Sequence, residues 1–369
     1  MTVVRLLLSV LTLAAVGFTL RPAAAEAAYY APSMEYGAGV FPLGHPGTTD
    51  RDFSAMSAAG ITWARVPVPW RSIEASCKDC RDWGDLDRVV NAASAHGIRL
   101  ILRVDRPPPW TRAVPVDNGP PDNPQDYADF IGALVARYGS AFVPAVEIWN
   151  EPNLSREWGG AVIDRNQAKQ YLYLLKLAYK TAHAADPNIT VLSAGLSPTG
   201  TADGTAQPDD VYLQWMYKED LALYADGIGL IGNGFGIPPE TPVLSDPSRP
   251  HQSFYFRHLE QMHDIMVANG DTSHQAWVLE HGYTSDPIHP DYAWSAVDEN
   301  TKGDYIVRAL QYAKANWSPW LAEITVWAIS DPEWTQDNEQ YWWAITDPDG
   351  TPRPAYNAIA AARANGALP

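Results

Sequence analysis

The chain has 369 residues, is 46% hydrophobic and carries a formal net charge of −17. Such an acidic protein is repelled by nucleic acid and by anionic membrane surfaces, so the composition argues against both as partners. The acidity suits a neutral substrate, although it also simply keeps a protein in solution. The length and the apolar content are sufficient for one large α/β domain.

Residues 1–28 have the pattern of an export signal. Arg5 supplies a positive start, and an apolar run followed by small residues comes after it. We therefore expect a signal peptide over residues 1–28, a catalytic domain over residues 29–369, and a secreted protein that has no membrane attachment after cleavage. No later segment has the ~18 consecutive apolar residues that a membrane-spanning helix requires.

Apolar runs typical of strands alternate with helical patterns along the rest of the chain. The expected strands are Tyr36–Phe41, Ile61–Pro67, Ile98–Val104, Ala145–Asn150, Ile189–Gly195, Gly227–Ile231, Ala276–Glu280 and Ile324–Ile329. The expected helices are Leu86–His96, Tyr127–Tyr138, a long helix from a cap at Asn166 to Ala185, Val211–Tyr217, Phe254–Ala268, Asp304–Asn316 and Ala355–Ala364. We expect the last helix to cover the floor of the domain.

Eight strand–helix units in one chain predict a single (β/α)8 TIM barrel. An open doubly wound sheet is the alternative, but the first strand is not followed by the glycine-rich phosphate turn that such sheets usually carry. The two cysteines, Cys77 and Cys80, would suit a redox pair or half of a zinc site in the cytosol. Because the export signal indicates an oxidising compartment, we expect a local disulfide instead, with no metal and no cofactor.

Two glutamates stand at the carboxyl ends of expected strands, Glu151 after the fourth and Glu280 at the end of the seventh. Cleavage of a glycosidic bond needs two carboxyl groups, one to protonate the leaving oxygen and one to attack the sugar. Asn150 offers a donor and an acceptor to a sugar hydroxyl. Pro152 predicts an extended Glu151, and strand alternation turns Asn150 away from Glu151 unless the strand end is bulged or twisted. Taken singly, each glutamate also fits a turn or a surface salt bridge.

Arg65 lies inside the second strand, where a charge must be paired or face a polar cavity. It fits either the support of a catalytic carboxylate or a structural ion pair with Glu147. Trp327, near the end of the last strand, offers an indole on which a sugar ring can stack. Six more tryptophans follow expected strands, and we expect some of them to line a sugar cleft: Trp70, Trp110, Trp158, Trp334, Trp342 and Trp343.

The strand ends Asn150-Glu151-Pro152 and Trp277-Val278-Leu279-Glu280, together with Arg65 and Trp327, resemble the clan A retaining glycoside hydrolases. The resemblance is to the cellulase-like family five and to family thirty-nine, and it covers about residues 33–362. It implies a TIM barrel and a double-displacement mechanism, with Glu151 as acid/base and Glu280 as nucleophile. It also implies that Asn150, Arg65 and Trp327 serve the sugar site.

One segment departs from the pattern of the clan, which usually shows a His and then a Tyr after the sixth strand. Here residues 230–236 contain neither, and Asn233 and Tyr283 are the expected substitutes. The sequence therefore predicts a secreted retaining β-glycosidase that hydrolyses oligo- or polysaccharides. A non-catalytic carbohydrate-binding barrel and a transglycosylase with the same residues are the alternatives. The identity of the sugar, the linkage, endo or exo action and the oligomeric state are open.

Overall fold

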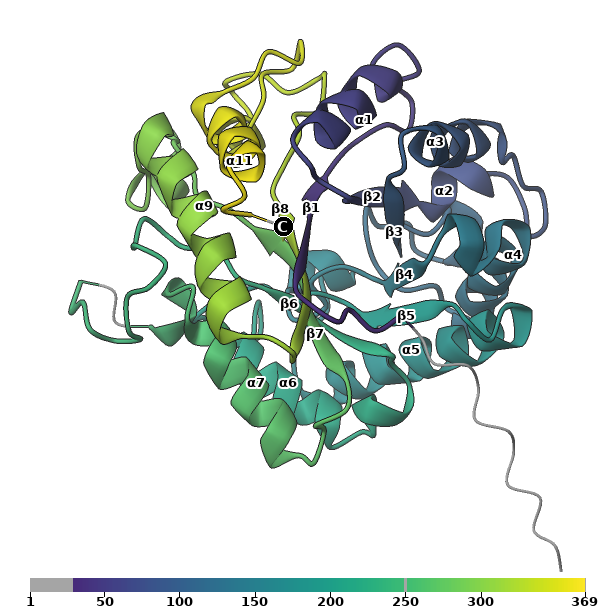
Figure 1. Ribbon diagram of the computed structural model, residues 1–369. Helices are drawn as coiled ribbons and strands as arrows, with labels where there is room; N and C mark the ends of the chain where they lie inside the picture. Colours follow the sequence, from purple (N-terminus) through teal and green to yellow (C-terminus); the bar gives the residue numbers. More distant parts are fainter. Residues whose placement is uncertain (1–28, 249–250, 369) are drawn as a thin grey trace, which may run out of the picture.

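The computed structural model describes residues 29–248 and 251–368, so the expected signal peptide lies outside the described residues. Eight parallel strands close into a barrel in chain order, with helices around them (Figure 1). The predicted TIM barrel is thus confirmed. The strands are β1 (Glu35–Gly39), β2 (Trp63–Pro69), β3 (Arg99–Asp105), β4 (Ala145–Ile148), β5 (Thr190–Ser193), β6 (Gly227–Ile231), β7 (Gln275–His281) and β8 (Leu321–Val326).

Helices follow the strands and form the outer layer of the barrel, with short extra helices in the loops (Figure 1). The helices are α1 (Thr49–Ala58), α2 (Trp70–Ile73), α3 (Gly84–Ala95), α4 (Pro124–Phe142), α5 (Arg165–Ala185), α6 (Asp209–Tyr217), α7 (His258–Ala268), α8 (Pro290–Ala293), α9 (Glu299–Asn316), α10 (Glu339–Trp343) and α11 (Pro354–Ala364). Single 3-10 turns are η1 (Pro109–Thr111), η2 (Ser155–Trp158), η3 (Leu221–Leu223) and η4 (Gln252–Phe254).

The amino-terminal end of the barrel is closed by the segment that precedes β1. The ring of Tyr29 packs edge-on against Trp63 at 5.3 Å and against Trp277 at 6.0 Å between ring centroids. Gln275, the first residue of β7, accepts a hydrogen bond from the Ala31 amide at 2.8 Å and donates one to its carbonyl at 2.9 Å. These contacts seal the apolar lower interior of the barrel from water.

The expectation that the last helix covers the barrel floor is wrong. Helix α11 lies in the outer ring between α9 and α1 (Figure 1). The Tyr356 hydroxyl donates to the Ala55 carbonyl of α1 at 2.8 Å. On the other side, a Cβ added to Gly303 of α9 would lie 3.0 Å from the Cα of Ala355. Helix α11 is therefore the helix of the eighth strand–helix unit, as barrel geometry requires.

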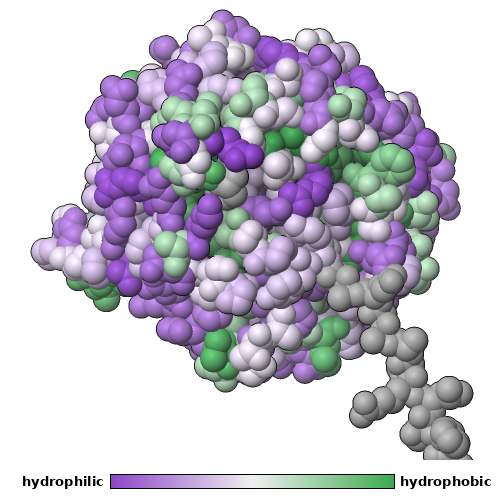
Figure 2. All heavy atoms as spheres, viewed as in Figure 1, coloured by the Kyte–Doolittle hydropathy of each residue, from purple (hydrophilic) through white to green (hydrophobic). Residues whose placement is uncertain are grey.

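The outer surface is mainly polar on the face shown in Figure 2, where hydrophobic residues form separate small groups. No helix among the described residues is both long and apolar enough to cross a bilayer. Cys77 and Cys80 are bonded to each other in the loop between α2 and α3, with their Cα atoms 5.3 Å apart. This loop lies apart from the residues that line the main pocket.

Candidate active site

A pocket of about 910 Å³ opens at the carboxyl ends of the strands, where barrel enzymes keep their chemistry. Residues from the ends of all eight strands, or from the loops that follow them, contribute to its wall. The lining residues include Phe41, Pro67, Arg103, Asp105, Asn150, Glu151, Arg156, Glu157, Ser197, Asn233, Phe235, Glu280, Tyr292, Trp327, Asp331, Trp334, Glu339 and Trp343.

The chain leaves β4 through an unusual backbone turn that brings Asn150 and Glu151 into the pocket together. Strand β4 ends at Ile148, and both Trp149 and Glu151 have positive φ, at 78° and 40°. The expected extended conformation of Glu151 is therefore wrong, and the alternation of the strand is broken by two left-handed residues. Positive φ is uncommon for residues other than glycine and marks places where the surroundings hold the backbone. Here the Glu151 amide donates to the Gly195 carbonyl at 3.2 Å.

Arg65 connects the buried Glu147 to the pocket residue Glu280. Its Nε and Nη2 donate to the two carboxylate oxygens of Glu147 at 2.6 and 2.8 Å, and both side chains are fully buried. Its Nη1 donates to Glu280 Oε1 at 2.6 Å. One side chain thus contacts both carboxylates, because a guanidinium has five N–H donors in a fixed fork.

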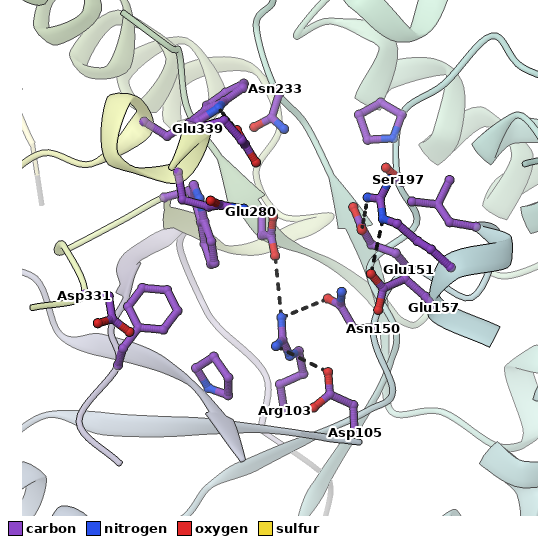
Figure 3. Close-up of a pocket in the computed structure, with 18 of the residues that line it drawn as sticks. Arg103, Asp105, Asn150, Glu151, Glu157, Ser197, Asn233, Glu280, Asp331 and Glu339 are labelled. Carbon is purple, nitrogen blue, oxygen red and sulfur yellow. Dashed lines mark hydrogen bonds and ion pairs between the residues drawn. The ribbon is translucent and has the colours of Figure 1, made fainter. Parts of the chain in front are cut away.

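Asn150 is oriented by two arginines. Its Oδ1 accepts hydrogen bonds from Arg65 Nη2 and from Arg103 Nη1, each at 3.1 Å. Arg103 in turn lies 3.3 Å from Asp105 and 4.0 Å from Glu280, as drawn in Figure 3. Since the amide oxygen is occupied, the amide nitrogen is the group that Asn150 can offer to a ligand.

The surroundings of Glu151 favour its protonated form. Burial, followed by the negative charge of Glu280, raises the pKa of the Glu151 carboxyl from 4.5 to about 7. Arg156 opposes this shift, and its Nη2 donates to Glu151 Oε2 at 3.1 Å. The Glu151 side chain retains 13% exposure, so burial acts on a group that a ligand can still reach. A carboxyl group with a pKa near 7 can supply a proton at neutral pH.

Aromatic rings line the side of the pocket formed by β1 and β8. The ring of Phe41 meets Trp327 edge-on at 5.4 Å and Trp334 at 4.8 Å between centroids. A Cβ added to Gly39 would lie 3.0 Å from the Trp327 ring, so glycine lets the indole approach β1 closely. Trp327 is partly exposed to the pocket, as a sugar platform requires.

Among the other predicted site residues, Asn233 follows β6 and lines the pocket, and its Oδ1 has no hydrogen-bond partner among the described residues. Tyr283 is fully buried behind Gly234 and is not among the residues that line the pocket. Trp110 also lies outside the lining, and its indole donates to the Glu74 carbonyl at 2.8 Å. The structure therefore brings Asn233 to the pocket with both glutamates and leaves Tyr283 and Trp110 apart from it.

Several charged residues of the pocket were not anticipated from the sequence, among them Arg156, Glu157, Asp331 and Glu339. Arg156 and Glu157 lie in η2, directly after the Asn-Glu-Pro turn, so their nearness in sequence to Glu151 was an available signal. Glu339 begins the short helix α10, well beyond the end of β8. No periodicity or spacing connects that position with the pocket.

Fold and pocket together define a class of protein. A closed (β/α)8 barrel with two glutamates at the ends of β4 and β7, facing one pocket, is the arrangement of a glycosidase. The model of the family Cellulase (glycosyl hydrolase family 5) matches residues 28–219, just over half of the chain. The chain therefore belongs to glycosyl hydrolase family 5.

Several solved structures share the fold at low sequence identity. A family 39 glycoside hydrolase from the gut symbiont Bacteroides cellulosilyticus WH2 has 19% identity and a TM-score of 0.69, over 89% of this chain and 63% of that protein. A glucosidase from Croceicoccus marinus has 13% identity and a TM-score of 0.65, over 91% and 68%. GH5_18 from Streptomyces cattleya, solved in complex with GlcNAc, has 14% identity and a TM-score of 0.60, over 91% and 80%. No curated protein matches the chain in sequence.

Proposed function

We propose that the protein is an exported retaining β-glycosidase that hydrolyses O-glycosidic bonds of oligo- or polysaccharides. Glu151 is the acid/base and Glu280 is the nucleophile. One observation carries the proposal: a single pocket holds a carboxyl group with a pKa of about 7 and a second carboxylate bound to a buried guanidinium at 2.6 Å. Two carboxyl groups in such different surroundings are suited to different roles.

In the first step, a carboxylate oxygen of Glu280 forms a bond to the anomeric carbon while the bond from that carbon to the glycosidic oxygen breaks. Glu151 gives its proton to the departing oxygen, which leaves as an alcohol. In the second step, Glu151, now a carboxylate, takes a proton from a water molecule whose oxygen attacks the anomeric carbon. Glu280 leaves as a carboxylate, and Glu151 is again protonated.

Neighbouring side chains position the sugar and the nucleophile. Arg65 fixes the direction of the Glu280 carboxylate through a charge-assisted hydrogen bond. The Asn150 amide donates to a hydroxyl of the sugar ring, and the indole of Trp327 packs against an apolar face of that ring. The family's description as Cellulase, and the description of a similar structure as a glucosidase, support β-linked neutral sugars as substrates.

Export is proposed from the sequence of residues 1–28, which combines a positive start, an apolar run and small residues before Tyr29. A polymeric carbohydrate that does not enter the cell requires an enzyme on the outside. Expression of the full chain in a bacterial host, with fractionation of the culture and sequencing of the mature amino terminus, tests this part. A protein that keeps residues 1–28 and remains in the cytosol contradicts it.

Replacement of the nucleophile tests the mechanism. With an aryl β-glycoside as substrate, we expect Glu280→Ala to lower kcat by about 10⁴-fold or more, the scale of removing a covalent nucleophile. Azide fills the space of the lost side chain and attacks in its place, so added azide should restore release of the aryl group. Glu333→Ala, at an exposed glutamate outside the pocket lining, is the matched control and should keep full activity.

Full activity of Glu280→Ala would end the assignment. Binding of polysaccharide by the unmodified protein, with no release of reducing sugar over days, would favour a non-catalytic carbohydrate-binding barrel. Transfer of the sugar to an added acceptor, in preference to water, would identify a transglycosylase that uses the same two glutamates.

A further inference from the structure

One carboxyl group of the pocket has no part in the proposed mechanism. Glu339 is partly buried at the start of α10, and its Oε2 accepts a hydrogen bond from the indole Nε1 of Trp343 at 2.9 Å. Both residues line the pocket. Among the described residues, no lysine or arginine forms an ion pair with Glu339. The second carboxylate oxygen, Oε1, is therefore available to a ligand.

The electrostatic surroundings of Glu339 indicate what kind of ligand suits it. Burial raises the pKa of its carboxyl group, the Trp343 hydrogen bond and Arg156 lower it, and the charges of Asp286 and Glu280 raise it further. A partly buried carboxyl group without a cation gains from any ligand that donates hydrogen bonds. Sugar hydroxyls are such donors, whereas an anionic group would be repelled.

The position of Glu339 relative to the two proposed catalytic glutamates decides which sugar it meets. Figure 3 shows Glu339 on the same side of the pocket as Glu280, whereas Glu151, Glu157 and Ser197 lie on the opposite side. The acid must stand beside the oxygen that leaves, so the leaving group occupies the side of Glu151. Glu339 therefore faces the ring that becomes attached to Glu280.

We propose that Glu339, oriented by Trp343, binds hydroxyl groups of the ring attached to Glu280 and so restricts the enzyme to neutral pyranosides. The inference rests on the proposed function, since the mechanism defines the two sides of the pocket. A carboxylate accepts hydrogen bonds from neighbouring hydroxyls at once. Asp331, on the same side as Glu280 in Figure 3, adds a further carboxyl group that disfavours a uronic acid ring.

A substrate panel tests this selectivity on the full chain. The probes are 4-nitrophenyl β-glycosides of glucose, galactose, mannose, xylose and glucuronic acid. We expect at least one glycoside of a neutral sugar to be hydrolysed and the glucuronide not to be hydrolysed. For the best neutral substrate, Glu339→Gln should lower kcat/KM by about 10- to 100-fold, because a hydrogen bond to a charged group is lost. Glu333→Gln, an exposed glutamate in the loop before α10, should stay within about twofold of the unmodified protein.

Deoxygenated substrates distinguish contact with the sugar from a structural role. When the hydroxyl that Glu339 binds is absent from the glycoside, Glu339→Gln should cost about threefold or less. Trp343→Phe keeps an aromatic ring and removes the indole N–H. The fall in kcat/KM of this variant therefore measures the effect of losing the hydrogen bond between Trp343 and Glu339 alone. If Glu339→Gln lowers kcat/KM by the same factor for every deoxygenated glycoside, and Trp343→Phe lowers it by that factor too, then Glu339 only supports Trp343. This result would overturn the inference.

Binding of cellobiose, measured by calorimetry, gives a readout that needs no turnover. Glu339→Gln should weaken binding by about tenfold or more in the Glu280→Ala background, where hydrolysis is blocked. If Glu280→Ala stays fully active, the mechanism fails, and binding of the free monosaccharide of the best substrate, which has no glycosidic bond to cleave, then decides whether Glu339 binds sugar. If Glu280 is essential and Glu339→Gln matches the unmodified protein with every probe, the inference fails and the mechanism stands. Hydrolysis of the glucuronide at the rate of the neutral glycosides would also overturn it.

Discussion

Arg65 and its partners show how single buried residues orient the side chains that line the pocket. A fully buried guanidinium binds Glu147 through two hydrogen bonds and Glu280 through a third, and it also reaches Asn150. Burying such a charge is costly unless its donors are paired, and here they are. The network therefore fixes both a proposed catalytic carboxylate and the amide beside the proposed acid.

Arg156 provides a test of the acid/base role by pH. Activity that needs protonated Glu151 falls as the pH rises through the pKa of that group, which is about 7. Because Arg156 lowers that pKa, Arg156→Gln should move the alkaline limb of the kcat/KM profile to higher pH. Arg156 is largely exposed, so the shift should be at most about 0.7 pH unit, as for an ion pair of ~1 kcal/mol.

Arg156→Lys, which keeps the charge, is the control and should move the limb less than Arg156→Gln does. A limb that moves to lower pH, or stays in place, would show that Glu151 is not the group whose protonation limits the reaction.

The sequence located several of these residues and missed others for physical reasons. Glu151, Glu280 and Arg65 were found because a charge within or at the end of an apolar strand is costly and therefore informative. The positive φ of Trp149 and Glu151 could not be predicted, since neither residue is glycine. Glu339 was missed because its place depends on the path of a long loop.

At the scale of single elements, the sequence misplaced the cap of one helix and missed another helix that has few buried apolar residues. Helix α5 ends at Ala185 as expected, but its cap is Asp164 rather than Asn166. The Asp164 carboxylate accepts a hydrogen bond from the Gln167 amide at 2.8 Å, and its backbone is extended. Helix α1 was not predicted, because Phe53 and Met56 are its only large buried apolar residues and two positions do not define a helical period.

The two candidate caps of α5 can be compared directly. Asp164→Ala should lower the free energy of unfolding by about 1 kcal/mol, because it removes the side-chain acceptor for an otherwise unpaired amide at the helix start. Asn166→Ala, at an exposed position inside the first turn, should change it by about 0.5 kcal/mol or less. Thermal or denaturant unfolding of both variants measures the difference. A larger effect at Asn166 than at Asp164 would contradict the observed cap.

At the scale of the whole molecule, the alternation of apolar runs and helical patterns was enough to predict the barrel. Strand β6 was predicted with its observed bounds, whereas β8 begins three residues before the expected start, at Leu321. The reason is Glu323, which is fully buried inside the barrel. In the sequence, a charged residue at this position suggests the end of an apolar run, so the predicted strand began after it. Burial raises its pKa well above 4.5, and the Thr325 hydroxyl donates to it at 2.9 Å.

The closure of the barrel floor by residues 29–31 could not be predicted from the sequence either. That short segment has neither helical nor strand periodicity, and its contacts with Trp63, Trp277 and Gln275 join positions far apart in the chain. The prediction therefore succeeded where local patterns decide the structure. It failed where long-range contacts decide it.

The stereochemistry of hydrolysis tests the central claim most directly, because two displacements at one anomeric carbon return it to its original configuration. Proton NMR of an aryl β-glycoside reaction, recorded before the free sugar equilibrates between its anomers, identifies the first product. We predict that the β-anomer is released first, through an intermediate bonded to Glu280. Release of the α-anomer first would mean a single displacement by water and would contradict the proposed role of Glu280.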